Sequence, residues 1–146
     1  FAVAAAGPDA RPEERLVADL MRLNPPTLAP SARFAEIARR FLELRVNNLY
    51  VADEAGKFLG VVSLHDIKPY LHEPDLAEVV LARDIVHDDF PRVTPGQTFT
   101  DALAGFLTVT AERLPVVDHD TRLQGSLAKS DLLLAIAERR KKPGRA

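Results

Sequence analysis

The sequence predicts an α+β fold made of two similar halves, and three observations support this prediction. The 146 residues have the length of one globular domain, and the 47% hydrophobic content is enough for a packed core. The chain aligns with itself at an offset of 65 residues, so that 17–71 matches 82–136 without a gap. Within each copy, apolar residues recur first at helical spacing and then in short strand-like runs.

The internal repeat places identical residues mainly at turn formers and at apolar positions. The identical pairs are Asp19/Asp84, Pro26/Pro91, Pro30/Pro95, Phe34/Phe99, Phe41/Phe106, Leu42/Leu107, Leu49/Leu114, Val51/Val116, Asp53/Asp118, Gly60/Gly125 and Asp66/Asp131. Turns and core positions are the places that a shared backbone constrains most strongly. The repeat therefore indicates one fold used twice.

Each copy opens with an extended segment that contains two prolines, and an amphipathic helix follows it. The apolar face of this helix is Phe34, Ile37, Phe41 and Leu44 in the first copy, and Phe99, Ala102, Leu103 and Phe106 in the second. The second helix begins with a capping box formed by Thr98 and Asp101. The first helix has Arg33 and Glu36 at these positions, so it retains only the acidic partner.

A hairpin and a closing helix complete each copy. The expected hairpin strands are 49–52 and 58–63 in the first copy and 114–117 and 123–128 in the second, and the closing helices are 65–71 and 129–139. Each half is therefore β-α-β-β-α, and alone it would leave one sheet face open. We expect the two halves to pack through their sheets with approximate two-fold symmetry, leaving a cleft between them for a ligand.

These elements predict five segments along the chain. They are an N-terminal segment with a lead-in helix over Arg15 to Leu23 (1–23), the first repeat (24–72), a linker (73–86), the second repeat (87–139) and a basic tail (140–146). The chain opens without Met and ends in this tail, so we expect it to be part of a longer protein.

Composition excludes several classes of chemistry. The chain has no cysteine, which removes disulfides and thiolate sites, and its four histidines lack metal-binding spacing. A net charge of −2 gives no field for nucleic-acid binding, because the basic cluster lies at the extreme C-terminus. No apolar run is long enough to span a bilayer. A P-loop and a G-x-S-x-G elbow are absent, which argues against an enzyme.

The most informative motif is Gly60-x-x-Ser63-x-x-Asp66, where the second strand of the first copy turns into a helix. Gly60 allows another backbone or a ligand to approach closely. Ser63 and Asp66 have the spacing of a capping box, which needs no ligand. The same geometry also suits a nucleotide, because the helix start attracts phosphate and a carboxylate accepts from two ribose hydroxyls. Both interpretations stay open at this point.

This motif, its preceding strand and its duplication resemble the tandem CBS domain, or Bateman module, over about residues 17–139. The resemblance implies a pseudo-symmetric disc that often dimerises and binds adenine nucleotides between its sheets, with no required cofactor. Gly60, Ser63 and Asp66 match the residues that contact ribose and phosphate in that family. In the second copy Gly125 and Asp131 match, but Ala128 replaces the hydroxyl residue, and that substitution removes one phosphate donor. The resemblance therefore favours the site at Asp66.

The resemblance also implies residues that contact adenine and phosphate. By position these are Thr27, Asn48, Leu49 and Tyr50 in the first copy and Arg92, Arg113, Leu114 and Pro115 in the second. Tyr50 could stack on a base, although a buried aromatic is the commoner fate of such a residue. Arg113 and Lys129 are candidate phosphate partners, although such side chains are usually only solvated.

A narrower resemblance concerns the parent protein. Residues 47–53 (NNLYVAD), 60–71 (GVVSLHDIKPYL) and 82–86 (ARDIV) are similar to the cytosolic C-terminal region of bacterial ClC-type chloride channels and transporters. This resemblance implies a cytoplasmic regulatory domain of an inner-membrane protein, with a membrane-embedded channel domain as its partner. A nucleotide would shift the packing of the module and so act on the pore. The alternative is a stand-alone protein, or part of another transporter, that serves as a ligand-free structural module for dimerisation.

Overall fold

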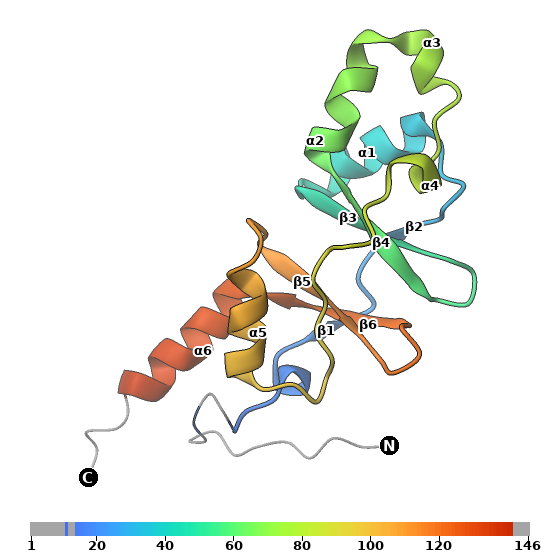
Figure 1. The fold of residues 1–146 in the computed structure, drawn as a ribbon. Helices are drawn as coiled ribbons and strands as arrows, with labels where there is room; N and C mark the ends of the chain where they lie inside the picture. Colours follow the sequence, from blue (N-terminus) through green and yellow to red (C-terminus); the bar gives the residue numbers. More distant parts are fainter. Residues whose placement is uncertain (1–10, 12–13, 142–146) are drawn as a thin grey trace. The chain divides into compact units, whose positions relative to one another are not determined.

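The computed structural model describes residue 11 and residues 14–141. The chain divides into two compact units: 26–90, and the residues up to 25 together with those from 91 onward. Each unit has its own three-stranded sheet with helices beside it (Figure 1). The predicted α+β class is confirmed, and each unit is described by itself below.

The sheet of unit 26–90 has the strand order β2-β3-β4. Its strands are β2 (Thr27–Leu28), β3 (Asn48–Ala52) and β4 (Phe58–Ser63); its helical segments are α1 (Phe34–Leu44), α2 (Leu64–Ile67), the 3-10 helix η2 (Lys68–His72), α3 (Pro74–Ala77) and α4 (Ala82–Ile85). Strand β2 runs parallel to β3, and β3 pairs antiparallel with β4. The predicted hairpin and amphipathic helix of the first copy are confirmed.

The core of this unit lies between the sheet and α1. Its buried members are Leu28, Ala32, Ile37, Phe41, Leu49, Val51, Val62, Ile67 and Ala82. Ile37 and Phe41 come from the apolar face of α1, and the strand residues alternate along β3 and β4 as a half-buried sheet requires. The opposite face of the sheet therefore carries the other set of alternating side chains.

The second unit repeats this plan with the strand order β1-β6-β5. Its elements are the 3-10 helix η1 (Val17–Asp19), β1 (Arg22–Leu23), α5 (Phe99–Phe106), β5 (Arg113–Val117), β6 (Leu123–Ala128) and α6 (Lys129–Lys141). Phe99 and Phe106 of α5 are buried, as are Leu114 of β5 and Leu127 of β6. Thr98 caps α5 and accepts from the Asp101 N–H at 3.1 Å, so the predicted capping box is confirmed.

In each unit, the segment that opens one sequence repeat packs against the other repeat. Ala82 donates its N–H to the Ala32 carbonyl at 2.9 Å, and Arg83 donates to Pro30 at 2.9 Å. At the positions 65 residues earlier, Val17 donates to Gln97 at 2.8 Å and Ala18 donates to Pro95 at 3.0 Å. These equivalent bonds show that both repeats use the same backbone, because the aligned donors and acceptors are themselves related by the offset.

The predicted lead-in helix over Arg15 to Leu23 is wrong. Only a single 3-10 turn forms, over Val17–Asp19, and the chain then extends as β1 to pair antiparallel with β6. The Asp19 carboxylate accepts the Leu16 N–H at 3.1 Å, and the N–H groups of the turn are used by residues 95–97. Tertiary hydrogen bonds thus replace the bonds that a helix would make.

Two further predictions concern the ends and the membrane. Helix α6 extends through Lys141, and the rest of the predicted basic tail, 142–146, lies outside the described residues. Within residue 11 and residues 14–141, none of the helices combines the length and hydropathy that a membrane span needs.

Candidate functional site

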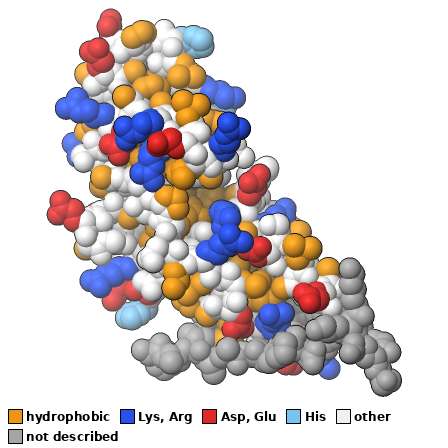
Figure 2. All heavy atoms as spheres, turned by 180° about the vertical axis from the view of Figure 1, so that it is seen from behind, with side chains coloured by type: hydrophobic (Ala, Val, Ile, Leu, Met, Phe, Trp, Pro, Cys, Tyr) orange, Lys and Arg blue, Asp and Glu red, His pale blue; other side chains and the backbone are white. Residues whose placement is uncertain are grey.

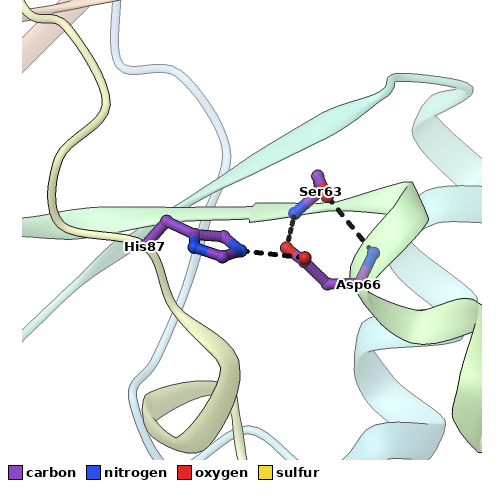
Figure 3. A network of polar contacts seen from close by, with 3 residues as sticks. All are labelled: Ser63, Asp66 and His87. Carbon is purple, nitrogen blue, oxygen red and sulfur yellow. Dashed lines mark hydrogen bonds and ion pairs between the residues drawn. The ribbon is translucent and has the colours of Figure 1, made fainter.

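The Ser63–Asp66 motif lies where β4 passes into α2 (Figure 3). The Ser63 N–H donates to Asp66 Oδ2 at 2.8 Å, and the Asp66 N–H donates to Ser63 Oγ at 3.2 Å. This reciprocal pair satisfies two backbone donors at the start of α2, as a capping box does. The structure therefore confirms the local geometry that the spacing predicted. It also leaves Asp66 Oδ1 outside the capping box.

His87 occupies that remaining oxygen. Its Nε2 lies 2.8 Å from Asp66 Oδ1, and the ring approaches from outside the helix (Figure 3). The backbone of His87 is held in place by two hydrogen bonds with Val61 of β4, at 2.8 and 2.9 Å. The histidine side chain is 56% exposed, whereas that of Asp66 is 16% exposed. His87 thus covers the carboxylate that the sequence motif singled out.

Gly60 permits this close approach. Its φ of +142° lies in a region that other residues rarely adopt. A Cβ built on Gly60 would overlap the backbone carbonyl of His87. The glycine of the motif is therefore explained by the neighbouring backbone of residues 86–87, which was one of its two predicted roles.

The two members of the ion pair shift each other's ionisation. Burial raises the pKa of Asp66, but hydrogen bonds from His87 and Ser63 outweigh it and bring the pKa below the ordinary 3.8. The hydrogen bond to Asp66 raises the pKa of His87 above the ordinary 6.5, against an opposing effect of burial, and the nearby charges of Asp89 and Asp88 add to the increase. Both partners are consequently charged between these two ordinary values.

The other predicted residues of the first copy lie on one face of the sheet. Thr27 pairs with Tyr50, Tyr50 pairs with Val61, and Val61 pairs with His87. Asn48 pairs with Ser63 two residues along the same strands. Side chains at paired positions and at two-residue steps share a face, so these residues lie on the face opposite the core packed on α1.

Tyr50 is a largely buried member of this face. It is 7% exposed, and its ring meets that of Phe58 edge to face, with centroids 5.9 Å apart. An edge-to-face pair is a stable arrangement for two aromatic rings. The commoner of the two predicted fates of Tyr50, a buried aromatic, is the one that the structure shows.

The second repeat has a matching arrangement with different side chains. Arg22 Nη2 lies 3.3 Å from Asp131 Oδ2, and a Cβ on Gly125 would overlap the Arg22 carbonyl. Arg22 and His87 are related by the 65-residue offset, as are Asp131 and Asp66. The side chain at Ala128 offers no hydroxyl, so the capping bond of Ser63 has no side-chain counterpart here. The second carboxylate is therefore paired with a permanent cation.

Arg113 and Ser126 form a polar contact within that repeat. Arg113 Nη1 donates to Ser126 Oγ at 3.2 Å, and Ser126 is 4% exposed. Ser126 stands two residues before Ala128 on β6 and therefore on the same face of the strand. Of the eight predicted site residues, Arg113 and Asp131 lie in this unit, and the other six lie in unit 26–90.

Sequence reasoning missed His87, Arg22 and Ser126 as members of these sites. The signal for the first two was present, because the offset aligns positions 22 and 87 and both carry basic side chains. It could not be interpreted without knowing that the lead-in segments form edge strands beside Gly60 and Gly125. Ser126 was missed because the motif directs attention to Ala128.

The surroundings offer no sign of a metal or nucleic-acid site. Among residue 11 and residues 14–141, His, Asp and Glu form no group of three or more that could hold a metal ion. On the face seen in Figure 2, acidic and basic side chains are interspersed with apolar ones.

Comparison with solved structures finds the same fold. The chain resembles the CBSX2 protein of Arabidopsis thaliana, solved in complex with AMP, with a TM-score of 0.73 and 24% identity over 86% of this chain and 98% of that one. It also resembles a CBS domain pair/ACT domain protein from Thermotoga maritima, with a TM-score of 0.72 and 31% identity over 84% of this chain and 97% of that one.

Comparison with curated proteins finds partial matches in longer chains. The chain is 25% identical over 116 residues to inosine-5'-monophosphate dehydrogenase of Aquifex aeolicus, covering 77% of this chain and 23% of the enzyme. It is 25% identical over 122 residues to the choline transport ATP-binding protein OpuBA of Bacillus subtilis, covering 84% of this chain and 31% of that protein. The chain thus spans about a quarter to a third of these two relatives.

A model of the CBS domain matches residues 17–73 and again 82–138. These two ranges begin 65 residues apart, at the offset of the internal repeat. The chain therefore belongs to the CBS domain family and carries two copies of the domain in tandem.

Proposed function

We propose that this CBS pair is a regulatory module that binds an adenine nucleotide at Asp66. The observation that carries the proposal is the placement of Asp66 and Ser63 at the junction of β4 and α2, beside the sheet face that holds Thr27, Asn48 and Tyr50. The AMP complex of CBSX2 supports a nucleotide as the ligand. The match of Gly60, Ser63 and Asp66 to the family motif supports the position.

The polar atoms of the motif suggest how each part of the ligand would bind. Asp66 Oδ2 is committed to the Ser63 N–H, so Oδ1 is the oxygen that we assign to a ribose hydroxyl. Ser63 Oγ accepts the Asp66 N–H, and its own proton is left to donate to a phosphate oxygen. The side chains of Thr27, Asn48 and Tyr50 would then line the base, with Arg113 and Asp131 serving a second site in the other repeat.

Calorimetric titration with AMP, ADP and ATP tests this assignment. Asp66→Asn keeps an oxygen for the Ser63 N–H but loses the charged acceptor, so we expect affinity to fall about tenfold or more. Asp131→Asn is the matched control in the other repeat and should retain binding at the first site. Absence of binding by the unmodified chain, or equal affinities for Asp66→Asn and the parent, would contradict the proposal.

The reciprocal pair Ser63→Ala and Ala128→Ser tests the role of the hydroxyl. We expect Ser63→Ala to weaken nucleotide binding, because a phosphate donor is lost, and Ala128→Ser to strengthen binding at Asp131. Adenosine, which has no phosphate, should bind the parent and Ser63→Ala with nearly equal affinity. A loss of adenosine binding in Ser63→Ala would assign the effect to the helix cap instead.

A ligand-free dimerisation module is the second candidate. The completeness of the capping box favours it, because Ser63 and Asp66 already satisfy each other's backbone groups without a ligand. This candidate predicts a homodimer in analytical ultracentrifugation and a melting temperature that AMP, ADP and ATP leave unchanged. A nucleotide-dependent increase in melting temperature would exclude it.

The parent protein is a separate part of the proposal. We propose a ClC-type channel or transporter of the inner membrane, with this pair on the cytoplasmic side, on the strength of residues 47–53, 60–71 and 82–86. The relatives found here belong to an enzyme and to an ATP-binding transport protein, so the host needs its own test. Sequencing the gene upstream of the codon for Phe1 supplies it. A series of long hydrophobic segments is expected there, and a start codon directly before Phe1 would refute this host.

A further inference from the structure

The two repeats differ at the group that pairs with the ligand-binding carboxylate. In the first repeat it is the imidazole of His87, 2.8 Å from Asp66 Oδ1. In the second it is the guanidinium of Arg22, 3.3 Å from Asp131 Oδ2. The backbone places both in the same way, on an edge segment that passes a glycine of the motif. Only the histidine changes charge near neutral pH.

We propose that His87 is a positioning residue that holds Asp66 in the empty site and gives way to the ligand, so that binding at Asp66 is coupled to proton release. This inference rests on the proposed binding of a ribose at Asp66. The outward oxygen of Asp66 is the one assigned to the sugar, and His87 occupies it. Because the His87 side chain is 56% exposed, it can turn into solvent while its backbone stays paired with Val61.

The direction of the pH effect follows from the charge of His87. Protonated His87 makes a charge-assisted hydrogen bond to Asp66, which is stronger than the bond from the neutral ring. A ribose hydroxyl therefore competes with a stronger occupant at low pH and a weaker one at high pH. Affinity should rise as pH increases, and a bound ligand should lower the pKa of His87 toward the ordinary value.

The charged groups around His87 support a response centred on Asp66. Strand β4, beside which His87 lies, carries no ionisable side chain. Helix α2 contributes Asp66, with an exposed His65 next to it, and exposed Lys68 follows the helix. The segment of His87 itself adds Asp88 and Asp89, which both favour the protonated ring. The hydrogen bond to Asp66 is the largest of the effects that raise the pKa of His87, so loss of this bond should dominate the response.

Adenosine is the appropriate probe because it has the ribose hydroxyls and no phosphate that titrates in this range. NMR titration of the His87 ring, with and without saturating adenosine, reports directly on this site. We expect the His87 pKa to fall on binding, and affinity to be roughly fivefold weaker at about pH 5.5 than at about pH 8. Calorimetry in buffers of different ionisation enthalpy should show release of less than one proton.

Two substitutions separate positioning from a general structural effect. His87→Arg copies the second repeat, and we expect it to bind adenosine with an affinity that no longer depends on pH. His65→Gln removes the exposed neighbouring imidazole and should leave the pH dependence unchanged. A probe lacking the 2′ and 3′ hydroxyls, dideoxyadenosine, should leave the His87 pKa where it is in the free protein.

The outcomes distinguish this inference from the proposed function. Adenosine binding with proton release in the parent and none in His87→Arg supports the inference. Binding without any change in the His87 pKa overturns it and leaves the nucleotide site standing. A free-state His87 pKa that Asp66→Asn does not alter would show that the pair is absent in solution, and it would overturn the inference whatever binds. Absence of binding at every pH overturns both.

Discussion

Ala82 donates its backbone N–H to the carbonyl oxygen of Ala32 across 2.9 Å, although the family match assigns these residues to different copies of the domain. Ala82 is fully buried in the core of the unit that contains Ala32. The structural unit therefore runs from 26 to 90. Each sequence repeat contributes its opening segment to the unit built mainly from the other repeat.

This exchange predicts how isolated halves will behave. A fragment of residues 26–90 retains Ala82 in its core and the Val61–His87 backbone bonds, whereas a fragment of residues 17–73 loses both. We expect circular dichroism to show more ordered structure, and a more cooperative melt, for 26–90. Equal order in the two fragments would show that the opening segment contributes nothing to the stability of the unit.

Gly60→Ala should destabilise the protein strongly. The substitution places a methyl group against the His87 carbonyl and forces alanine to adopt a φ of +142°. Backbone strain of this kind costs about 1–3 kcal/mol, and the steric overlap adds to it. Urea unfolding measures the loss. Gly96→Ala is the control, because a Cβ there meets nothing within 4 Å, and a comparable loss in that variant would contradict the steric explanation.

Arg33→Thr should stabilise the protein. Arg33 is the N-cap of α1 and makes no side-chain cap hydrogen bond, whereas Thr98 at the equivalent position caps α5. Glu36 already supplies the acidic residue in the first turn of α1. We expect a gain of about 1 kcal/mol in the free energy of unfolding. Arg33→Ala removes the same side chain without supplying a cap, so a similar gain in that variant would assign the effect to the loss of arginine.

The Asp66–His87 pair predicts a window of pH in which it stabilises the fold. The raised pKa of His87 contributes stability that is fully present below about 6.5 and is lost as pH rises through the folded value. The lowered pKa of Asp66 contributes stability that is present above about 3.8 and is lost as pH falls through the folded value. The pair therefore stabilises most between these values.

Comparison of the parent with His87→Gln tests this window by urea unfolding. The parent should be more stable at about pH 5.5, by no more than about 1 kcal/mol because His87 is half exposed, and the difference should vanish at about pH 8.5. His87→Arg serves as the control, with a contribution that stays constant over this range. A stability difference that grows with pH would contradict the ionisation assigned to His87.

Much of the fold could be predicted from the sequence because local patterns determine it. Phe34, Ile37 and Phe41 recur at helical spacing, and α1 forms over the predicted residues. The second strands of both hairpins, Phe58–Ser63 and Leu123–Ala128, form with the predicted ends. The capping boxes at Ser63 and Thr98 form because their hydrogen bonds span only three residues.

The lead-in segment shows where such patterns fail. The sequence from Arg15 to Leu23 favours a helix locally, yet Arg22 and Leu23 form an edge strand on β6. Their partners, Ser126 and Gly125, are about a hundred residues away in the chain. Propensity within a short window cannot report on a partner so distant, and the backbone bonds of the sheet outweigh the local preference.

The sequence by itself determined that one fold is used twice and that Gly60, Ser63 and Asp66 form a strand-to-helix junction, because repetition and short-range hydrogen bonding can be recognised along the chain. Only the tertiary structure decided which cation faces each carboxylate: His87 opposite Asp66, and Arg22 opposite Asp131. Those contacts join residues that are neighbours only after the opening segments have paired with the sheets, and sheet pairing is a long-range event that no local pattern specifies.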